Sequence, residues 1–192
     1  MKKRLMRSRI LTPAPHIILN HLKHEKYKHI PEHVLGCSCE ICVSLLDSAE
    51  FTPLKAQFQK RIKKYIREWK QYTLQLPVQK LPYLPEQNLK IESSWFSIME
   101  ERQKLSFHAH ERSIVSGVYY PHFPKGSVNL IIEGEEIDIR EGYLYLFPSW
   151  AEHGTEENQS KERYVIAFNV GIASYTNTTL KTPQKREQQI KN

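Results

Sequence analysis

Three histidines combine the residue type and the spacing that a metal site requires. His108 and His110 are two residues apart, so in an extended segment both imidazole rings point to the same side. His153 comes much later, just past an apolar run at residues 143–147. Imidazole binds iron, zinc, copper and nickel, and an octahedral ion with three protein ligands keeps positions for substrate and oxygen. The alternative is that these are ordinary surface histidines in a chain that has nine.

Arg163 adds a second chemical function to this predicted site. It lies ten residues after His153, at the start of the next apolar run and across a polar turn. If that run is a strand returning antiparallel, Arg163 points into the same barrel, where a guanidinium can bind a carboxylate through two parallel hydrogen bonds. A metal beside a buried arginine indicates a ferrous site with a dicarboxylate co-substrate. The alternative is an exposed arginine that forms a salt bridge beside Glu162.

Short strands in the second half of the chain have to position these side chains. Runs rich in β-branched and aromatic residues predict strands at residues 114–120, 128–132, 136–139, 143–147 and 164–168. Glycines at 126, 134, 142 and 154 mark the turns between them. Many short strands with close turns predict a mainly β sandwich or barrel, which we place at about residues 95–170. Trp69, Trp95 and Trp150 are interpreted as core or barrel-rim packing.

One amphipathic helix precedes the strands and is expected to support the barrel. Apolar residues recur at three- and four-residue spacing through residues 52–75, with lysines between them. Thr52 is predicted as the N-cap, with Pro53 at the first helical position. We therefore divide the chain into a basic extension containing His and Cys (1–50), a single catalytic-type barrel domain with its supporting helix (51–175) and a disordered polar tail (176–192).

Two sequence motifs are similar to those of a known family. They are Ser-Gly-Val-Tyr-Tyr at 116–120 and Leu-Phe-Pro-Ser-Trp at 146–150, the second followed by His153 and Gly154. Together with His108, Arg163 and Ala-Phe-Asn at 167–169, they resemble the 2-oxoglutarate/Fe(II) oxygenases that are related to prolyl 4-hydroxylases and occur in marine bacteria and phages. The resemblance implies a double-stranded β-helix, which is a jelly-roll or cupin-like barrel.

The resemblance also implies roles for particular residues. His108 is similar to the first iron ligand and His153 to the distal one. Arg163 matches the basic residue that binds the far carboxylate of 2-oxoglutarate, and Tyr120 and Asn169 occupy strand positions expected to line the co-substrate pocket. The implied activity is a dioxygenase that depends on Fe(II) and 2-oxoglutarate, with hydroxylation of an unactivated C–H bond as its usual outcome.

The second ligand and one connection depart from the wider superfamily. Most members have a carboxylate two residues after the first histidine, whereas this chain has His110, a pattern that resembles this particular family. Glu111 is the nearest carboxylate, but the alternation of a strand would turn it away from His108 and His110. The chain between Ser127 and Gly142 is also shorter than in family members, and we expect a compact connection there.

Three cysteines form a second candidate metal site. Cys37, Cys39 and Cys42 have C-x-C and C-x-x-C spacing, and with His29 or His33 they could complete a tetrahedral zinc site. The alternative is three reduced cysteines packed near the start of a helix. Their odd number argues against a framework of disulfides.

Basic residues are in excess and are unevenly placed. The chain is 40% hydrophobic and 26% charged, with a net charge of +7, and basic runs lie near the N-terminus and at residues 55–70. Such runs suit an acidic partner, including nucleic acid, or else form a solvated face. Apolar runs of about eighteen residues are absent, so we expect no membrane span and a cytoplasmic protein.

Three functions remain open at the level of the sequence. The first is a 2-oxoglutarate-dependent hydroxylase of an unspecified substrate, for which the basic half of the chain favours an anionic or macromolecular molecule. The second is a cupin-like metalloprotein without oxygenase activity, which has no need of a buried Arg163. The third is a basic protein that uses the barrel as a scaffold and binds nucleic acid or an acidic partner.

Overall fold

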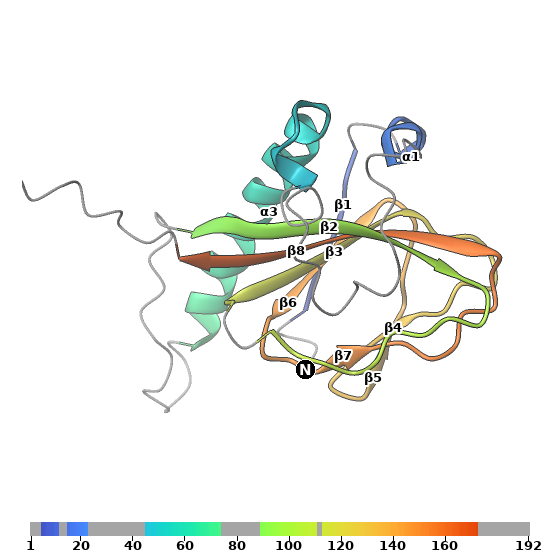
Figure 1. The fold of residues 1–192 in the computed structure, drawn as a ribbon. Coiled ribbons are helices and arrows are strands. Elements are labelled where there is room, and N and C mark those ends of the chain that lie inside the picture. The colour runs from blue at the N-terminus through green and yellow to red at the C-terminus, as the bar shows by residue number, and fades with distance from the viewer. Residues whose placement is uncertain (1–4, 12–14, 23–44, 74–88, 111–112, 173–192) are drawn as a thin grey trace, which may run out of the picture.

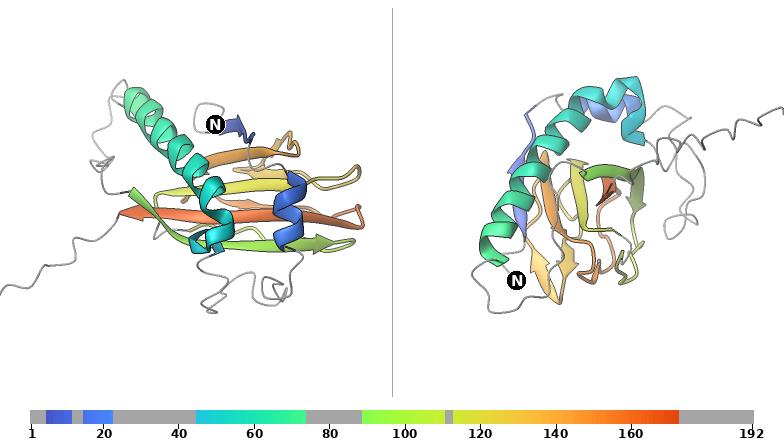
Figure 2. Two further views of the ribbon diagram at one scale, coloured as in Figure 1. Left: turned by 90° about the horizontal axis from the view of Figure 1, so that it is seen from above. Right: turned by 90° about the vertical axis from the view of Figure 1, so that its left-hand side faces the viewer.

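Two antiparallel β-sheets face each other in the structure, and helices cover the outer side of the larger sheet (Figures 1 and 2). The computed structural model describes residues 5–11, 15–22, 45–73, 89–110 and 113–172. The five-stranded sheet has the order β1-β6-β3-β8-β2 and the three-stranded sheet the order β5-β4-β7. The predicted mainly β fold of the double-stranded β-helix type is confirmed.

Five strands agree with the predicted runs, and three more, β1, β2 and β7, are added. The larger sheet contains β1 (Met6–Arg9), β2 (Leu89–Glu100), β3 (Val115–His122), β6 (Tyr143–Pro148) and β8 (Glu162–Ile172). The smaller sheet contains β4 (Leu130–Ile132), β5 (Glu135–Ile137) and β7 (His153–Gly154). Strand β1 pairs with β6, so part of the basic N-terminal region belongs to the larger sheet. The predicted boundary at residue 50 stays a prediction.

The larger sheet separates two apolar cores by the alternation of its side chains. On β3, Tyr119 points to the helices, whereas Val118 and Tyr120 point between the two sheets. Phe58 of α3 (Thr52–Thr73) stacks on Phe168 with ring centroids 5.0 Å apart, and its ring lies 5.5 Å from that of Tyr119. The core between the two sheets, which we call the inner core, contains the candidate site. The core between the larger sheet and the helices, the outer core, holds in place the sheet that carries the site.

Helix α3 has the predicted apolar stripe but a different beginning. Its stripe is buried against the sheet, as expected, through Leu54, Phe58, Ile62, Tyr65, Ile66 and Trp69. Thr52 is already helical, with φ −51° and ψ −45°, because the 3-10 helix η4 (Ala49–Phe51) runs directly into α3. The prediction of Thr52 as N-cap is therefore wrong. The remaining described helices are α1 (Pro15–Leu22) and η3 (Leu45–Asp47). None of the described helices is long and apolar enough to cross a membrane.

A tight hairpin accounts for the short connection between Ser127 and Gly142. Strands β4 and β5 pair antiparallel, and the two residues between them, Glu133 and Gly134, have φ values of 50° and 75°. Two successive positive φ values define the type I′ turn that suits the twist of a hairpin. Leu130 and Ile132 of this hairpin are buried and form part of the inner core.

Candidate metal and anion site

Backbone pairing brings the three histidines together from two distant segments. His108 and His153 form an antiparallel bridge, in which each backbone N–H donates to the other's carbonyl at 3.0 and 2.9 Å. The N–H of His110 donates to the carbonyl of Ser149 at 2.8 Å. The extended segment after β2 is therefore held along the chain that joins β6 to β7. Its two-residue period places the rings of His108 and His110 on the same side.

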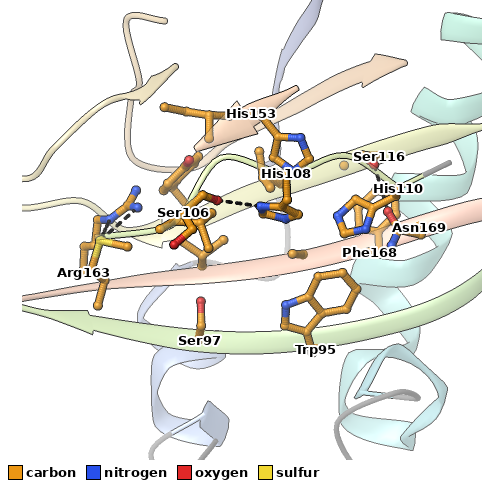
Figure 3. Close-up of a pocket in the computed structure, with 18 of the residues that line it drawn as sticks. Trp95, Ser97, Ser106, His108, His110, Ser116, His153, Arg163, Phe168 and Asn169 are labelled. Atoms are coloured by element: carbon orange, nitrogen blue, oxygen red, sulfur yellow. Dashed lines mark hydrogen bonds between the residues drawn. The ribbon is translucent and has the colours of Figure 1, made fainter. Parts of the chain in front are cut away.

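The three imidazole rings converge on one point (Figure 3). Each ring offers one nitrogen, and these three nitrogen atoms lie within 4.8 Å of one another. The ring centroids are 4.4 Å apart for His108 and His153, 4.9 Å for His108 and His110, and 5.2 Å for His110 and His153. Such convergence is what a single metal ion with three imidazole ligands requires.

Hydrogen bonds fix which ring nitrogen can bind a metal in two of the histidines. The Nδ1 atom of His108 lies 2.8 Å from the carbonyl oxygen of Ser106, and that of His153 lies 2.9 Å from the carbonyl oxygen of Ala151. A carbonyl only accepts, so each Nδ1 carries the proton and donates it. Nε2 then keeps its lone pair, which is the arrangement that metal-binding histidines usually have.

The surroundings keep two of the rings neutral. Burial, with smaller contributions from His108 and His110, lowers the pKa of His153 to about 4, although its hydrogen bond to the Ala151 carbonyl acts in the opposite direction. Burial also lowers the pKa of His110 to about 4, with a smaller contribution from His108. Both imidazoles are therefore uncharged at neutral pH, and a metal ion does not have to displace a proton from them.

A cavity of about 470 Å³ lies between the two sheets and contains the histidine cluster. All six residues that the sequence singled out for metal or co-substrate binding line it: His108, His110, Tyr120, His153, Arg163 and Asn169. Among the described residues of its wall there is no aspartate or glutamate, whereas Lys104 and Arg163 are basic. The cavity therefore carries positive charge without an acidic side chain to balance it.

Arg163 is buried in this wall with few hydrogen-bond acceptors around it. Its side chain is 2% exposed, and its Nε and Nη2 atoms contact the sulfur of Met99 at 3.3 and 3.2 Å (Figure 3). Its buried Nη1 atom has no hydrogen-bond partner among the described residues. A thioether is a weak acceptor, so the guanidinium is left with unused donors. The alternative of an exposed arginine that forms a salt bridge beside Glu162 is wrong, because Arg163 is buried; the Glu162 carboxylate accepts from the Tyr164 hydroxyl at 3.2 Å.

Tyr120 and Asn169 lie in different parts of the cavity. The guanidinium carbon of Arg163 is 5.5 Å from the centroid of the Tyr120 ring. Asn169 lies on the other side of the histidines from Arg163, close to His110 (Figure 3). Its Oδ1 atom accepts from the Ser116 hydroxyl at 2.8 Å, and Ser116 in turn lies 3.1 Å from the Ser149 hydroxyl. The structure places both residues on the wall, and their binding roles stay predictions.

Strand β2 contributes a wall of the cavity that the sequence did not reveal. Trp95, Ser97 and Met99 alternate along β2 and line the cavity, and the Trp95 ring lies 6.1 Å from that of His110. From the sequence, Trp95 was interpreted as packing alone. The two-residue alternation from Trp95 to Met99 was the available signal, because an inward-facing strand beside β8 must share its cavity.

Other predicted residues lie outside the part of the chain that the structure describes. These are the candidate zinc ligands Cys37, Cys39 and Cys42, the carboxylate of Glu111 and the tail from residue 176.

Comparison with known proteins gives similar solved structures, while no family model and no curated protein matches the chain. One is an oxidoreductase of the 2OG-Fe(II) oxygenase family from Burkholderia pseudomallei, with 10% identity, 66% of this chain and 53% of that chain covered, and a TM-score of 0.44. Another is a viral collagen prolyl hydroxylase from Paramecium Bursaria Chlorella virus-1, with 12% identity, coverage of 63% and 73%, and a TM-score of 0.46.

A third similar structure is a salicylate 1,2-dioxygenase from Pseudaminobacter salicylatoxidans, with 12% identity, coverage of 43% and 21%, and a TM-score of 0.33. The chain thus spans about half the length of the Burkholderia protein and about a fifth of this dioxygenase. The family that the sequence motifs resemble is represented among the similar structures.

Proposed function

We propose that this chain is a 2-oxoglutarate-dependent Fe(II) oxygenase that hydroxylates an unidentified substrate. One observation carries the proposal: a cluster of three metal-competent histidines shares a cavity with a buried guanidinium that has an unused donor. A histidine cluster alone also suits a metalloprotein of another kind, and a buried arginine alone also suits a purely structural role. Together they provide a metal at one point and a carboxylate anchor at another, which is what a chelating dicarboxylate co-substrate needs.

His108, His110 and His153 are the proposed ligands of the iron. Their neutral imidazoles fit a divalent first-row ion, and three protein ligands leave open positions on an octahedral ion. When bound, ferrous iron supplies the activation of oxygen, with 2-oxoglutarate as the source of electrons. Apolar side chains, including Val118 and Phe147, line the cavity around the cluster, and the Phe147 ring lies 4.9 Å from that of His153.

Arg163 is the proposed anchor for the far carboxylate of 2-oxoglutarate. A buried guanidinium is stabilised by an anion that accepts from its free N–H groups, and such charge-assisted bonds are the strong ones. Burial raises the pKa of Tyr120, so its phenol stays protonated next to Arg163 and can donate to the same carboxylate. The positive, acid-free wall favours a dianion over a neutral ligand.

The proposal is tested by adding Fe(II) and 2-oxoglutarate to the protein without oxygen. A keto acid that chelates ferrous iron gives a weak visible charge-transfer band, and we expect this band in the wild type. His153→Ala should lose it because iron is no longer held, whereas His122→Ala should keep it. His122 faces Glu141 at 3.4 Å and is not among the described residues of the cavity wall. A folded wild-type protein without the band would exclude the proposal.

A cupin-like metalloprotein without oxygenase activity is the second candidate. The observation that favours it is His110, an imidazole at the position where the wider superfamily has a carboxylate. Under this alternative the histidines bind metal, but 2-oxoglutarate does not change the spectrum or the affinity for the ion. The same anaerobic titration therefore separates the two candidates.

A further inference from the structure

Helix α3 carries a row of basic side chains on its solvent face. Lys60, Lys63, Lys64 and Arg67 are exposed, and each lies three or four residues from two of the others, so they form one stripe along the helix. With a rise of about 1.5 Å per residue, the stripe is about 10 Å long. We call these four residues the α3 basic stripe.

In the described part of the chain, little negative charge balances the stripe. Lys64 lies 3.7 Å from the Glu68 carboxylate, and both side chains are more than half exposed. Among the described residues, Lys60, Lys63 and Arg67 have no ion pair. An exposed pair such as Lys64 with Glu68 contributes little free energy, so a polyanion can displace the glutamate. Glu68 is the only acidic residue in the sequence of α3.

The opposite face of α3 is committed to the fold. Leu54, Phe58, Ile62 and Ile66 are buried against the larger sheet, at about 180° from the stripe around the helix. The helix lies on the outer side of that sheet (Figure 2), whereas the cavity is lined by side chains of its inner side, including Val118, Tyr120 and Val165. A partner can therefore bind the stripe without entering the cavity.

We propose that the α3 basic stripe binds double-stranded nucleic acid through its phosphate backbone, independently of base sequence. Each strand of a duplex presents one charge per about 3.4 Å of axis, so the stripe matches about three phosphates of one strand. Single-stranded binding relies on aromatic platforms, and the described aromatics of α3 (Phe58, Tyr65 and Trp69) are buried. Helices that lie in a membrane surface bury an apolar face beside their charges, and the apolar face of α3 is already buried against the sheet.

Salt dependence of duplex binding tests the proposal quantitatively. The probe is a labelled duplex of about 20 base pairs, titrated with the full chain at several salt concentrations and followed by fluorescence anisotropy. Each phosphate contact contributes about 0.9 to the slope of log affinity against log salt. The double variant Lys60→Gln/Lys63→Gln should reduce the slope by about 1.8 and weaken binding by at least about tenfold at low salt. Glutamine preserves the helix, because its helix propensity is close to that of lysine.

A matched double variant controls for net charge. Lys125→Gln/Lys161→Gln removes the same charge from two exposed lysines that lie outside α3, and it should leave the slope unchanged. His153→Ala should also leave it unchanged, which separates this site from the proposed oxygenase. Equal losses in the two lysine variants, no binding by the wild type, or equally tight binding of polyglutamate would each overturn the proposal.

Discussion

Arg163 is buried in the inner core, where its described contacts are the Met99 sulfur and the side chain of Tyr120, and these offset only part of the cost of removing its charge from water. A guanidinium removed from water requires acceptors, and here a thioether sulfur and an aromatic ring take their place. Structural arginines in protein interiors are normally paired with carboxylates or carbonyls. We infer that the Nη1 group of Arg163 donates to a ligand. Arg163 then lowers the stability of the ligand-free protein but strengthens the binding of that ligand.

Substitution of Arg163 should therefore have an unusual effect on stability. Arg163→Met replaces a buried charge by an apolar side chain of similar length, so the unfolding free energy of the metal-free protein should stay the same or rise by about 1–2 kcal/mol. Urea denaturation of both proteins measures this difference. A loss of more than about 1 kcal/mol would indicate a structural role instead.

The pKa of His153 predicts how the stability of the metal-free protein depends on pH. Its pKa is about 4 in the folded chain, where burial lowers it, against an ordinary value of 6.5. Below pH 6.5 the unfolded chain therefore binds a proton that the folded chain does not, and stability falls as the pH is lowered towards 4. Between pH 7 and 5 this contribution is about 2 kcal/mol.

Urea titrations at pH 7 and at pH 5 measure this change in the free energy of unfolding. His153→Gln, which cannot titrate, should lose less stability than the wild type over the same interval. An identical loss in the two proteins would show that His153 titrates normally in the folded state.

Among the contacts between elements, those of Asn158 connect the end of β2, which lines the cavity, to two neighbouring loops. Its Nδ2 group lies 2.9–3.1 Å from the carbonyl oxygens of Met99, Glu100 and Ser160, and its Oδ1 accepts from the backbone of Val128 at 3.2 Å. Its own backbone exchanges hydrogen bonds with Arg102 and Gln103. One buried amide therefore connects the end of β2 with the loops before β4 and β8.

Removing this side chain should destabilise the protein strongly. Asn158→Ala leaves several buried backbone groups without partners, and we expect a loss of about 2–4 kcal/mol in the free energy of unfolding. The neighbouring Gln159 is exposed, and Gln159→Ala should change stability by less than about 0.5 kcal/mol. Chemical denaturation of the two variants tests the difference, and equal effects would contradict this role of Asn158.

Local patterns predicted elements well where the buried faces are apolar. The stripe of α3 has a helical period because one face of the helix meets an apolar core, whereas the runs around Tyr119, Leu146 and Ile166 are almost continuously apolar because both faces of these strands are buried. Strand β1 was not predicted, since Met6–Arg9 is short and basic and owes its conformation to pairing with β6. The beginning of α3 was wrong for a similar reason, because η4 precedes it without a break.

At the scale of the molecule, the histidine cluster joins parts that are distant in the sequence. His108 and His110 follow β2 of the larger sheet, while His153 belongs to β7 of the smaller sheet. The spacing of two residues predicted the pair, and the site could be inferred because strand alternation is local. How deeply the site is buried, and that Trp95 lies beside His110, depend on how the two sheets face each other. No local sequence pattern specifies this arrangement.

A metal ion bound to all three histidines should therefore stabilise the whole fold. Zinc, which has no redox chemistry, serves as the probe, and at 100 times its dissociation constant it should add about 2.7 kcal/mol to the unfolding free energy. His153→Ala should abolish this gain, whereas His122→Ala should keep it. Thermal or urea denaturation with and without zinc measures the effect, and a gain that survives His153→Ala would place the metal elsewhere.

We propose that one molecule of 2-oxoglutarate joins the histidine-bound iron to Arg163. Anaerobic calorimetry of the Fe(II)-loaded protein tests this with two ligands, 2-oxoglutarate and pyruvate, a keto acid that lacks the far carboxylate. Arg163→Met should weaken the binding of 2-oxoglutarate by about 10- to 150-fold, the equivalent of about 1.5–3 kcal/mol for a charge-assisted hydrogen bond. The affinity for pyruvate should stay nearly unchanged. Equal losses for both ligands, or no loss for either, would contradict the account.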